Sequence, residues 1–127
     1  MKYSGKKAVY IDDNKVMLPV VRKKLESLGF VVDTEESANI LFELMKTKEY
    51  DLIILDDMMP QMSGTEAMQK LKKEGCTIPI IVLTGNNKPE DRERYLHLGF
   101  DDYIAKPPTD EEFDRVLTIF IDKLMGD

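Results

Sequence analysis

Short apolar runs alternate with longer amphipathic segments five times along the chain, and this alternation limits the fold more than any other feature. The runs cover residues 8–11, 30–32, 52–55, 80–83 and 103–105. Apolar residues recur at helical spacing in three of the intervening segments and in a last segment over 113–124. A polar segment from about Pro89 to Leu98 is expected to form the remaining helix. Three of the four-residue runs are apolar at every position, as in parallel strands that helices cover on both faces. The pattern predicts a doubly wound α/β fold with a five-stranded parallel sheet and five helices.

The number of strands also favours one strand order. A five-stranded chain fits the flavodoxin-like order 2-1-3-4-5 better than the six-stranded Rossmann order. The first run is followed by Ile11-Asp12-Asp13-Asn14, where a dinucleotide-binding chain would have its glycine fingerprint. Dinucleotide binding is therefore not expected. Gly29 is expected to end the first helix, and Pro19 predicts either a late start or a local distortion of that helix.

Charge and cysteine content exclude several classes of protein. The chain has 18 basic and 24 acidic residues, a net charge of −6, which argues against direct nucleic-acid binding. No apolar run approaches the roughly 18–20 residues of a membrane span, so membrane insertion is not expected. Cys76 is the only cysteine, which favours a reducing compartment. We expect a single cytoplasmic domain over residues 1–127, with its core at about 7–124.

Polar residues stand where four of the five expected strands end. They are Asp12 and Asp13 after the first strand, Asp56 and Asp57 after the third, Thr84 at the end of the fourth and Lys106 after the fifth. In the order 2-1-3-4-5 the first and third strands are neighbours, so their carboxylates converge and require a compensating cation. Mg²⁺ takes oxygen ligands of this kind, and a hydroxyl and an ammonium group suit phosphoryl oxygens. The sequence therefore predicts a magnesium and phosphate site at this edge.

Each position also has a simpler interpretation. Asp12-Asp13-Asn14 fits a helix cap, Asp56-Asp57 fits ordinary loop polarity, and Lys106 fits a surface lysine at a turn. Four independent polar features at one edge of one sheet are hard to reconcile with coincidence, which favours the functional interpretation.

These motifs resemble those of the receiver domain of the two-component response-regulator family, from Lys7 to about Leu124. The similarity lies in residues 11–14, in 51–60 with Gly64, in 81–85, and in 102–107. It implies that Asp56, four residues before Pro60, accepts a phosphoryl group from a phosphohistidine on a histidine kinase or phosphotransfer protein. Asp57 is the competing acceptor, but alternation along a strand predicts that its side chain points away.

The same resemblance implies a role for each of the remaining residues. Asp13, Asp56 and the backbone carbonyl of Met58 would bind Mg²⁺ directly, and Asp12 would act mainly through a metal-bound water. Lys106 would pair with Asp56 and then with the phosphoryl group, and the Lys106–Pro107 bond would be cis. On phosphorylation Thr84 would move toward the phosphoryl oxygen and Tyr103 would rotate inward. That switch would change the face formed by the fourth helix, fifth strand and fifth helix, where a second copy or a downstream partner would dock.

Two other function classes stay open at this stage. An aspartate-based phosphohydrolase needs a second acid two residues after its nucleophile, and Met58 stands there. A receiver-like binding module that is never phosphorylated would lack the acid pair, the threonine or the lysine, and this sequence has them all. We therefore expect a signalling receiver that catalyses only its own phosphoryl transfer and dephosphorylation. It would be either a stand-alone receiver or part of a longer protein such as a hybrid sensor kinase.

Overall fold

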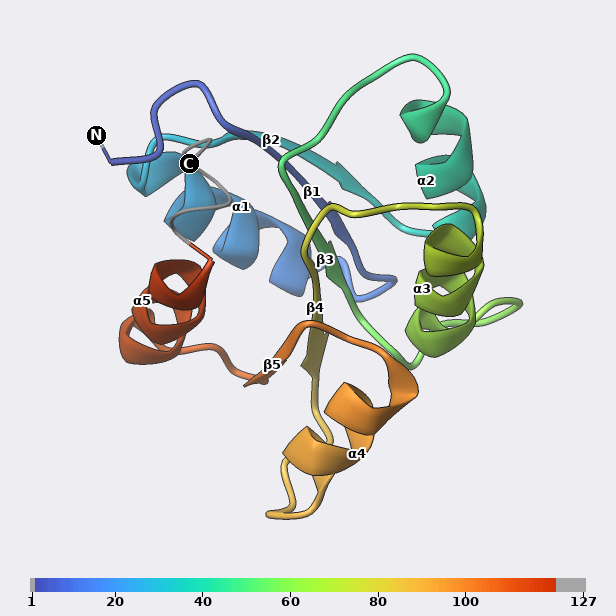
Figure 1. Cartoon of the computed structure of the whole chain (residues 1–127). Coiled ribbons are helices and arrows are strands. Elements are labelled where there is room, and N and C mark those ends of the chain that lie inside the picture. The colour runs from blue at the N-terminus through green and yellow to red at the C-terminus, as the bar shows by residue number, and fades with distance from the viewer. Residues whose placement is uncertain (1, 121–127) are drawn as a thin grey trace.

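The computed structural model describes residues 2–120 of the chain, and within them five parallel strands form one sheet in the order β2-β1-β3-β4-β5 (Figure 1). This is the predicted doubly wound architecture. The strands are β1 (Lys7–Ile11), β2 (Val31–Glu35), β3 (Leu52–Leu55), β4 (Ile80–Thr84) and β5 (Asp102–Ala105). The helices are α1 (Met17–Ser27), α2 (Ala38–Met45), α3 (Gly64–Lys73), α4 (Asp91–Leu98) and α5 (Asp110–Ile119).

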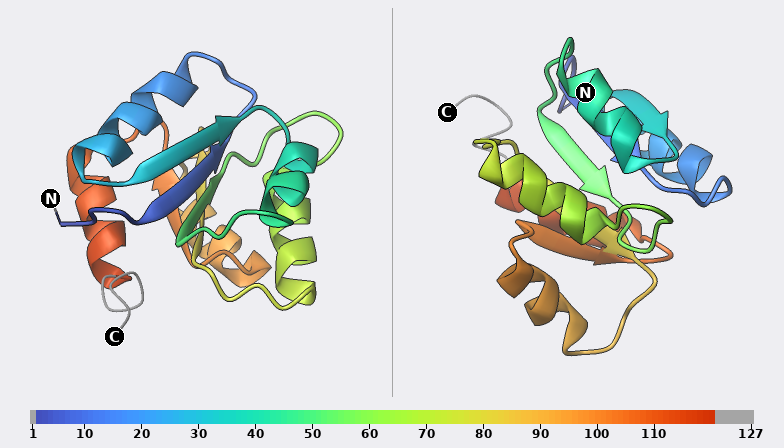
Figure 2. Two further views of the ribbon diagram at one scale, coloured as in Figure 1. Left: turned by 90° about the horizontal axis from the view of Figure 1, so that it is seen from above. Right: turned by 90° about the vertical axis from the view of Figure 1, so that its right-hand side faces the viewer.

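Helices cover both faces of the sheet, with α1 and α5 on one side and α2, α3 and α4 on the other (Figures 1 and 2). Successive side chains along a strand point to opposite faces. In β1, Ala8 and Tyr10 accordingly belong to the core cluster beneath α1 and α5, whereas Val9 and Ile11 belong to the other cluster. Both faces of the central strands are buried, which explains why their sequences are apolar without alternation.

Several element boundaries differ from the sequence-based expectation, most clearly those of β2 and α4. The strand expected over 30–32 is β2, which begins at Val31 and continues to Glu35. Its last three residues are polar and only half-buried because β2 lies at the edge of the sheet, so they escape a search for apolar runs. The helix expected from residue 89 begins at Asp91. The expected position of Leu124 on the last helix lies outside the described residues.

The helix α1 accommodates Pro19 by starting late, which is one of the two predicted outcomes. Pro19 is the third residue of this helix, in the first turn, where a backbone N–H has no partner within the helix. Gly29 follows the helix with φ of 107°, a left-handed conformation that glycine adopts readily. In residues 2–120 no helix is long and apolar enough to cross a membrane.

Candidate functional site

The acidic residues after β1 and β3 meet at the carboxyl edge of the sheet. Ile11 lies opposite Leu55 in the β1–β3 pairing, and the Asp56 N–H donates a 2.9 Å hydrogen bond to the Ile11 carbonyl. Carboxylate oxygens of Asp12, Asp13 and Asp56 lie within 4.8 Å of one another. Asp12 and Asp56 are buried, whereas Asp13 is exposed. The convergence expected from the strand order is therefore present.

Lys106 lies between the two buried carboxylates. Its Nζ is 2.8 Å from Oδ2 of Asp12 and 3.1 Å from Oδ1 of Asp56, and its side chain is only 17% exposed. The Lys106 N–H donates a 2.8 Å hydrogen bond to the Thr84 carbonyl, which joins the end of β5 to that of β4. The interpretation of Lys106 as a surface lysine is therefore wrong, and the lysine belongs to the acidic site.

The burial and the charges of the site shift two pKa values. Burial, together with the negative charge of Asp12, raises the pKa of Asp56 above its ordinary value, and Lys106 offsets only part of this effect. Burial alone would lower the pKa of Lys106. The hydrogen bond to Asp12 and the charges of both aspartates outweigh burial, so the pKa of Lys106 is raised. Lys106 therefore stays protonated as the cation of the site.

Protein donors occupy both carboxylate oxygens of Asp12. Its Oδ1 accepts a 2.9 Å hydrogen bond from the Asn14 N–H, and its Oδ2 accepts from the Tyr10 hydroxyl as well as from Lys106. The N-cap of α1 is Val16, with no side-chain hydrogen bond at the cap. The Asn14 side chain accepts a 3.0 Å hydrogen bond from the Val16 N–H, so Asn14 caps the turn that leads into α1. The helix-cap interpretation therefore holds for Asn14, whereas Asp12 belongs to the acidic site.

Tyr10 is a residue of this site that the sequence analysis missed. It is fully buried near the carboxyl end of β1, and burial with the hydrogen bond to Asp12 raises its pKa far above the ordinary value of tyrosine. Tyr10 and Asp12 are two residues apart and share a face because of the alternation along an extended chain. That spacing is the signal that would have revealed the contact.

Asp57 points away from the acidic site, as alternation predicted. Its Oδ1 accepts hydrogen bonds from the N–H of Thr65 at 3.0 Å and from the Thr65 hydroxyl at 2.8 Å. Its Oδ2 accepts a 2.8 Å hydrogen bond from the hydroxyl of Tyr95 in α4. Asp56 and Asp57 are therefore neighbours in the chain whose side chains point in opposite directions. The structural role of Tyr95 was not apparent from the sequence.

Thr84 and Tyr103 are both linked to Asn86, in the loop after β4. The buried Thr84 hydroxyl accepts a 3.3 Å hydrogen bond from the Asn86 N–H, and the Tyr103 hydroxyl donates to the Asn86 carbonyl. The Tyr103 ring is 7% exposed and stacks on Tyr95, with the ring centroids 5.9 Å apart. The Lys106–Pro107 peptide bond is cis.

The donor set fits a hard divalent cation. All three converging side chains offer carboxylate oxygens, and a single ammonium group balances only one of their three charges. Mg²⁺ is typically bound in proteins by one or two carboxylates with water completing its shell. Asp13 and Asp56 are the carboxylates best placed to serve as ligands, because the oxygens of Asp12 already have protein donors. Met58 follows in the loop, with a side chain that is exposed.

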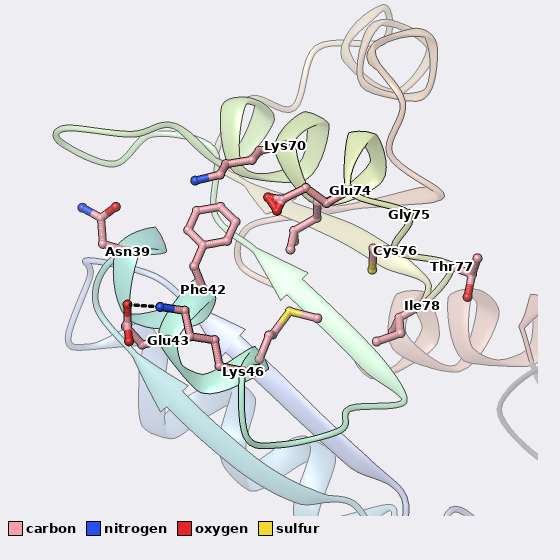
Figure 3. Close-up of a pocket in the computed structure, with 12 residues that line it drawn as sticks. Asn39, Phe42, Glu43, Lys46, Lys70, Glu74, Gly75, Cys76, Thr77 and Ile78 are labelled. Carbon is pink, nitrogen blue, oxygen red and sulfur yellow. Dashed lines mark hydrogen bonds and ion pairs between the residues drawn. The ribbon is translucent and has the colours of Figure 1, made fainter.

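A groove of about 870 Å³ lies away from the acidic site, between α2 and the C-terminal end of α3 (Figure 3). Three of its charged side chains contact neighbours: Lys46 pairs with Glu43 at 3.0 Å, and the Nζ of Lys70 lies 4.3 Å from the Phe42 ring centroid. None of its lining residues belongs to the acidic edge. The groove is therefore a separate feature of the surface, apart from the acidic site.

The sequence matches the family described as the response regulator receiver domain over residues 8–118. It is 35% identical over 115 residues to the transcriptional regulatory protein TctD of Salmonella typhimurium, a match that covers 91% of this chain and 51% of that protein. It is 37% identical over 101 residues to the transcriptional regulatory protein CusR of Escherichia coli, covering 80% of this chain and 44% of CusR. The chain thus spans about half the length of the curated relatives it matches.

Solved structures give the same picture of the fold. The receiver domain of the Francisella response regulator 1452 superposes with a TM-score of 0.84 and 27% identity, covering 94% of this chain and 98% of that one. The signal receiver domain of a signal transduction histidine kinase from Syntrophus aciditrophicus superposes with a TM-score of 0.76 and 28% identity. That match covers 96% of this chain and 91% of the other. Similar domains are thus found both in response regulators and in a histidine kinase.

Proposed function

The chain belongs to the response regulator receiver domain family, and from this premise we propose that Asp56 is its phosphoryl acceptor. The domain is a signalling module of two-component systems. The observation that carries the assignment of Asp56 is its contact with Lys106, which also binds Asp12 across the acidic edge. A buried carboxylate with a cation beside it and two further carboxylates close by can accept a phosphoryl group whose charge the site then neutralises.

In the proposed reaction, a carboxylate oxygen of Asp56 attacks the phosphorus of a phosphohistidine on a partner protein. The P–N bond breaks as the new P–O bond forms, and the leaving imidazole takes up a proton from solvent to become neutral histidine. Lys106 is the residue that compensates the charge of the transferring phosphoryl oxygens. Hydrolysis of the acyl phosphate by water later releases inorganic phosphate and restores the carboxylate, which ends the signal.

The proposal includes Mg²⁺ at the acidic edge. Asp13, Asp56 and the backbone carbonyl of Met58 are its proposed ligands, and Asp12 would act mainly through a bound water. When bound, Mg²⁺ supplies positive charge that stabilises the phosphoryl oxygens during transfer. The position of Asp12, with protein donors on both oxygens, supports an indirect role for this residue.

We further propose that Thr84 and Tyr103 form the switch. Thr84 would turn its hydroxyl toward the phosphoryl oxygen, and Tyr103, which is already buried in this structure, would occupy the space that this movement opens. Their shared partner Asn86 supports such a coupling, because the movement of Thr84 would disturb a loop that also holds Tyr103. The surface of α4, β5 and α5 is the proposed docking face for a second copy or a downstream partner. Phosphorylation would shift the equilibrium between two conformations of this surface.

The partners and the cellular setting are also part of the proposal. A histidine kinase or a phosphotransfer protein would be the phosphodonor, and the cytoplasm would be the location because the single cysteine, Cys76, favours a reducing compartment. The proposed activity is limited to the domain's own phosphoryl transfer and dephosphorylation. A phosphohydrolase of the aspartate type would need an acid at the position of Met58.

The test is intact mass measurement after incubation with acetyl phosphate, with and without Mg²⁺. Wild type and Asp57→Asn are expected to gain one phosphoryl group in the presence of Mg²⁺, and Asp56→Asn none. Loss of the gain in Asp57→Asn alone would contradict the assignment of the acceptor. No gain in any sample, including a reaction with a phosphorylated histidine kinase, would indicate a receiver-like module that is not phosphorylated.

A further inference from the structure

Tyr10 and Lys106 share one oxygen of Asp12. The Tyr10 hydroxyl and the Lys106 ammonium group both donate to Oδ2, the latter at 2.8 Å, and the Asn14 N–H donates to Oδ1 at 2.9 Å. Tyr10 and Asp12 are both fully buried, so no exposed solvent competes for these contacts. The phenol reaches the functional edge from within the core cluster that packs beneath α1 and α5.

Lys106 is also shared, between Asp12 and Asp56. Its Nζ lies closer to Asp12, at 2.8 Å, than to Asp56, at 3.1 Å, so the two carboxylates compete for one cation. A hydrogen bond to a carboxylate stabilises its charge and reduces its need for a counter-ion. The Tyr10 hydroxyl therefore weakens the attraction between Asp12 and Lys106. The interaction of Lys106 with Asp56 becomes correspondingly stronger.

We propose that Tyr10 is a positioning residue for phosphoryl transfer, because its hydroxyl shares Oδ2 of Asp12 with Lys106 and so keeps Lys106 available to Asp56. This inference rests on the proposed function of Asp56. Tyr10 does not touch the reacting atoms, and it acts only through Asp12 and Lys106. Without the hydroxyl, Asp12 would draw Lys106 away from the phosphoryl group, and transfer would slow.

The chain offers a matched control for this contact. The Tyr50 hydroxyl donates a 2.6 Å hydrogen bond to Oδ2 of Asp33, which also accepts a 3.0 Å hydrogen bond from Lys48. This is the same combination of phenol, carboxylate and ammonium group, but none of the three belongs to the acidic site. Tyr10→Phe and Tyr50→Phe therefore remove the same hydroxyl from the same kind of contact, and only Tyr10 faces the acceptor.

The experiment measures the initial rate of phosphorylation by acetyl phosphate as a function of Mg²⁺ concentration for wild type, Tyr10→Phe and Tyr50→Phe. We expect the maximal rate of Tyr10→Phe to fall by about tenfold, a size typical of a residue that supports a ligand-binding group. The Mg²⁺ concentration at half-saturation should stay within about twofold of wild type, because the proposed ligands are untouched. Tyr50→Phe should keep the wild-type rate although it loses stability.

Each outcome bears on a different claim. A maximal rate of Tyr10→Phe equal to wild type, or an equal loss in both variants, would overturn the role of Tyr10. A wild-type protein that takes up no phosphoryl group would instead overturn the proposed function. Should Tyr10→Phe fail to fold in circular dichroism, NMR on wild type decides: the Tyr10 hydroxyl proton should exchange slowly and show a cross peak to the Lys106 ammonium protons. Absence of that cross peak would overturn the inference.

Discussion

The hydroxyl of Tyr95 in α4 donates a 2.8 Å hydrogen bond to Oδ2 of Asp57, the residue next to the proposed acceptor. Together with two hydrogen bonds from Thr65, this contact gives the Asp57 carboxylate three donors. Asp56 shares its single ammonium partner with Asp12 and lies close to the carboxylates of both Asp12 and Asp13. We therefore expect these adjacent aspartates to have opposite effects on the stability of the fold: Asp57 should stabilise it and Asp56 should destabilise it.

The first prediction follows from that contrast. In the presence of a chelator, Asp56→Asn should raise the free energy of unfolding by about 1 kcal/mol, because it removes repulsion among buried carboxylates. Asp57→Asn should lower it by about 1–2 kcal/mol, because an amide cannot accept all three hydrogen bonds. Urea unfolding of both variants and wild type measures the two changes.

Addition of Mg²⁺ is the control for the first prediction. The cation should raise the stability of wild type by an amount that grows with its concentration, and should raise that of Asp56→Asn by less. An Asp56→Asn protein that is less stable than wild type in chelator would contradict the idea that repulsion dominates at this site.

The second prediction concerns Tyr95. Its hydroxyl donates to Asp57 and accepts a 2.9 Å hydrogen bond from the Asn86 side chain, so Tyr95→Phe breaks two contacts in the core. We expect a loss of stability of about 1–3 kcal/mol, since Asp57 and Asn86 would each lose a partner. Hydrogen exchange should be faster in α4, and phosphorylation of Asp56 should persist. Unchanged exchange in α4 would contradict a role of Tyr95 in anchoring this helix.

Much of the fold and the site followed from the sequence, because both depend on the order of buried strands. The apolar runs identify the central strands, and once β1 and β3 are neighbours Asp12 and Asp56 must converge. The last residues of β2 were missed because an edge strand tolerates polar residues such as Thr34. A strand can be recognised in such a sequence when both of its faces are buried, because its residues are then all apolar. High β-propensity alone is not sufficient.

The parts that the sequence did not predict are side-chain contacts across the core. Tyr10 looked like one apolar residue of a strand, and Tyr95 looked like part of a polar helix. Each tyrosine packs its ring in the core and donates a hydrogen bond from its hydroxyl to an aspartate. A tyrosine counts as apolar in a periodicity search, and where its hydroxyl points depends on how the elements pack.

The third prediction concerns Gly64, the first residue of α3. A Cβ at this position would lie 2.2 Å from the backbone oxygen of Asp56, so any side chain must displace the loop that holds the acceptor. We expect Gly64→Ala to cost about 1–3 kcal/mol of stability and to slow phosphorylation of Asp56. Thermal unfolding and intact mass after acetyl phosphate treatment measure the two effects.

Gly85→Ala is the matched control, since Gly85 also lies at the carboxyl edge of the sheet, directly after Thr84. A Cβ on Gly85 would meet no heavy atom within 4 Å, and its φ is not left-handed. This variant should unfold and be phosphorylated like wild type. Equal behaviour of the two alanine variants would show that the close approach at Gly64 is not what fixes the acceptor loop.

The fourth prediction is a pH dependence at the edge strand β2. The hydrogen bond from Tyr50, with the contact from Lys48, lowers the pKa of Asp33 below its ordinary value. The unfolded chain, with an aspartate pKa of about 3.9, binds this proton at higher pH than the folded chain does. The stabilisation by Asp33 is therefore complete above about pH 4 and is lost as the pH falls through the lowered pKa of the folded state.

Tyr50→Phe should reveal this dependence in urea unfolding from about pH 7 down to about pH 3. The variant should be less stable than wild type by about 1 kcal/mol near neutrality. The difference should shrink as the pH falls below about 4 and through the lowered pKa of Asp33 in wild type, because the hydroxyl then loses the ionised carboxylate that it prefers. Glu43→Gln is the comparison, since the Glu43–Lys46 pair is exposed and such pairs contribute little. A difference between Tyr50→Phe and wild type that stays constant with pH would mean that the Tyr50 hydroxyl stabilises the fold without preferring the ionised Asp33.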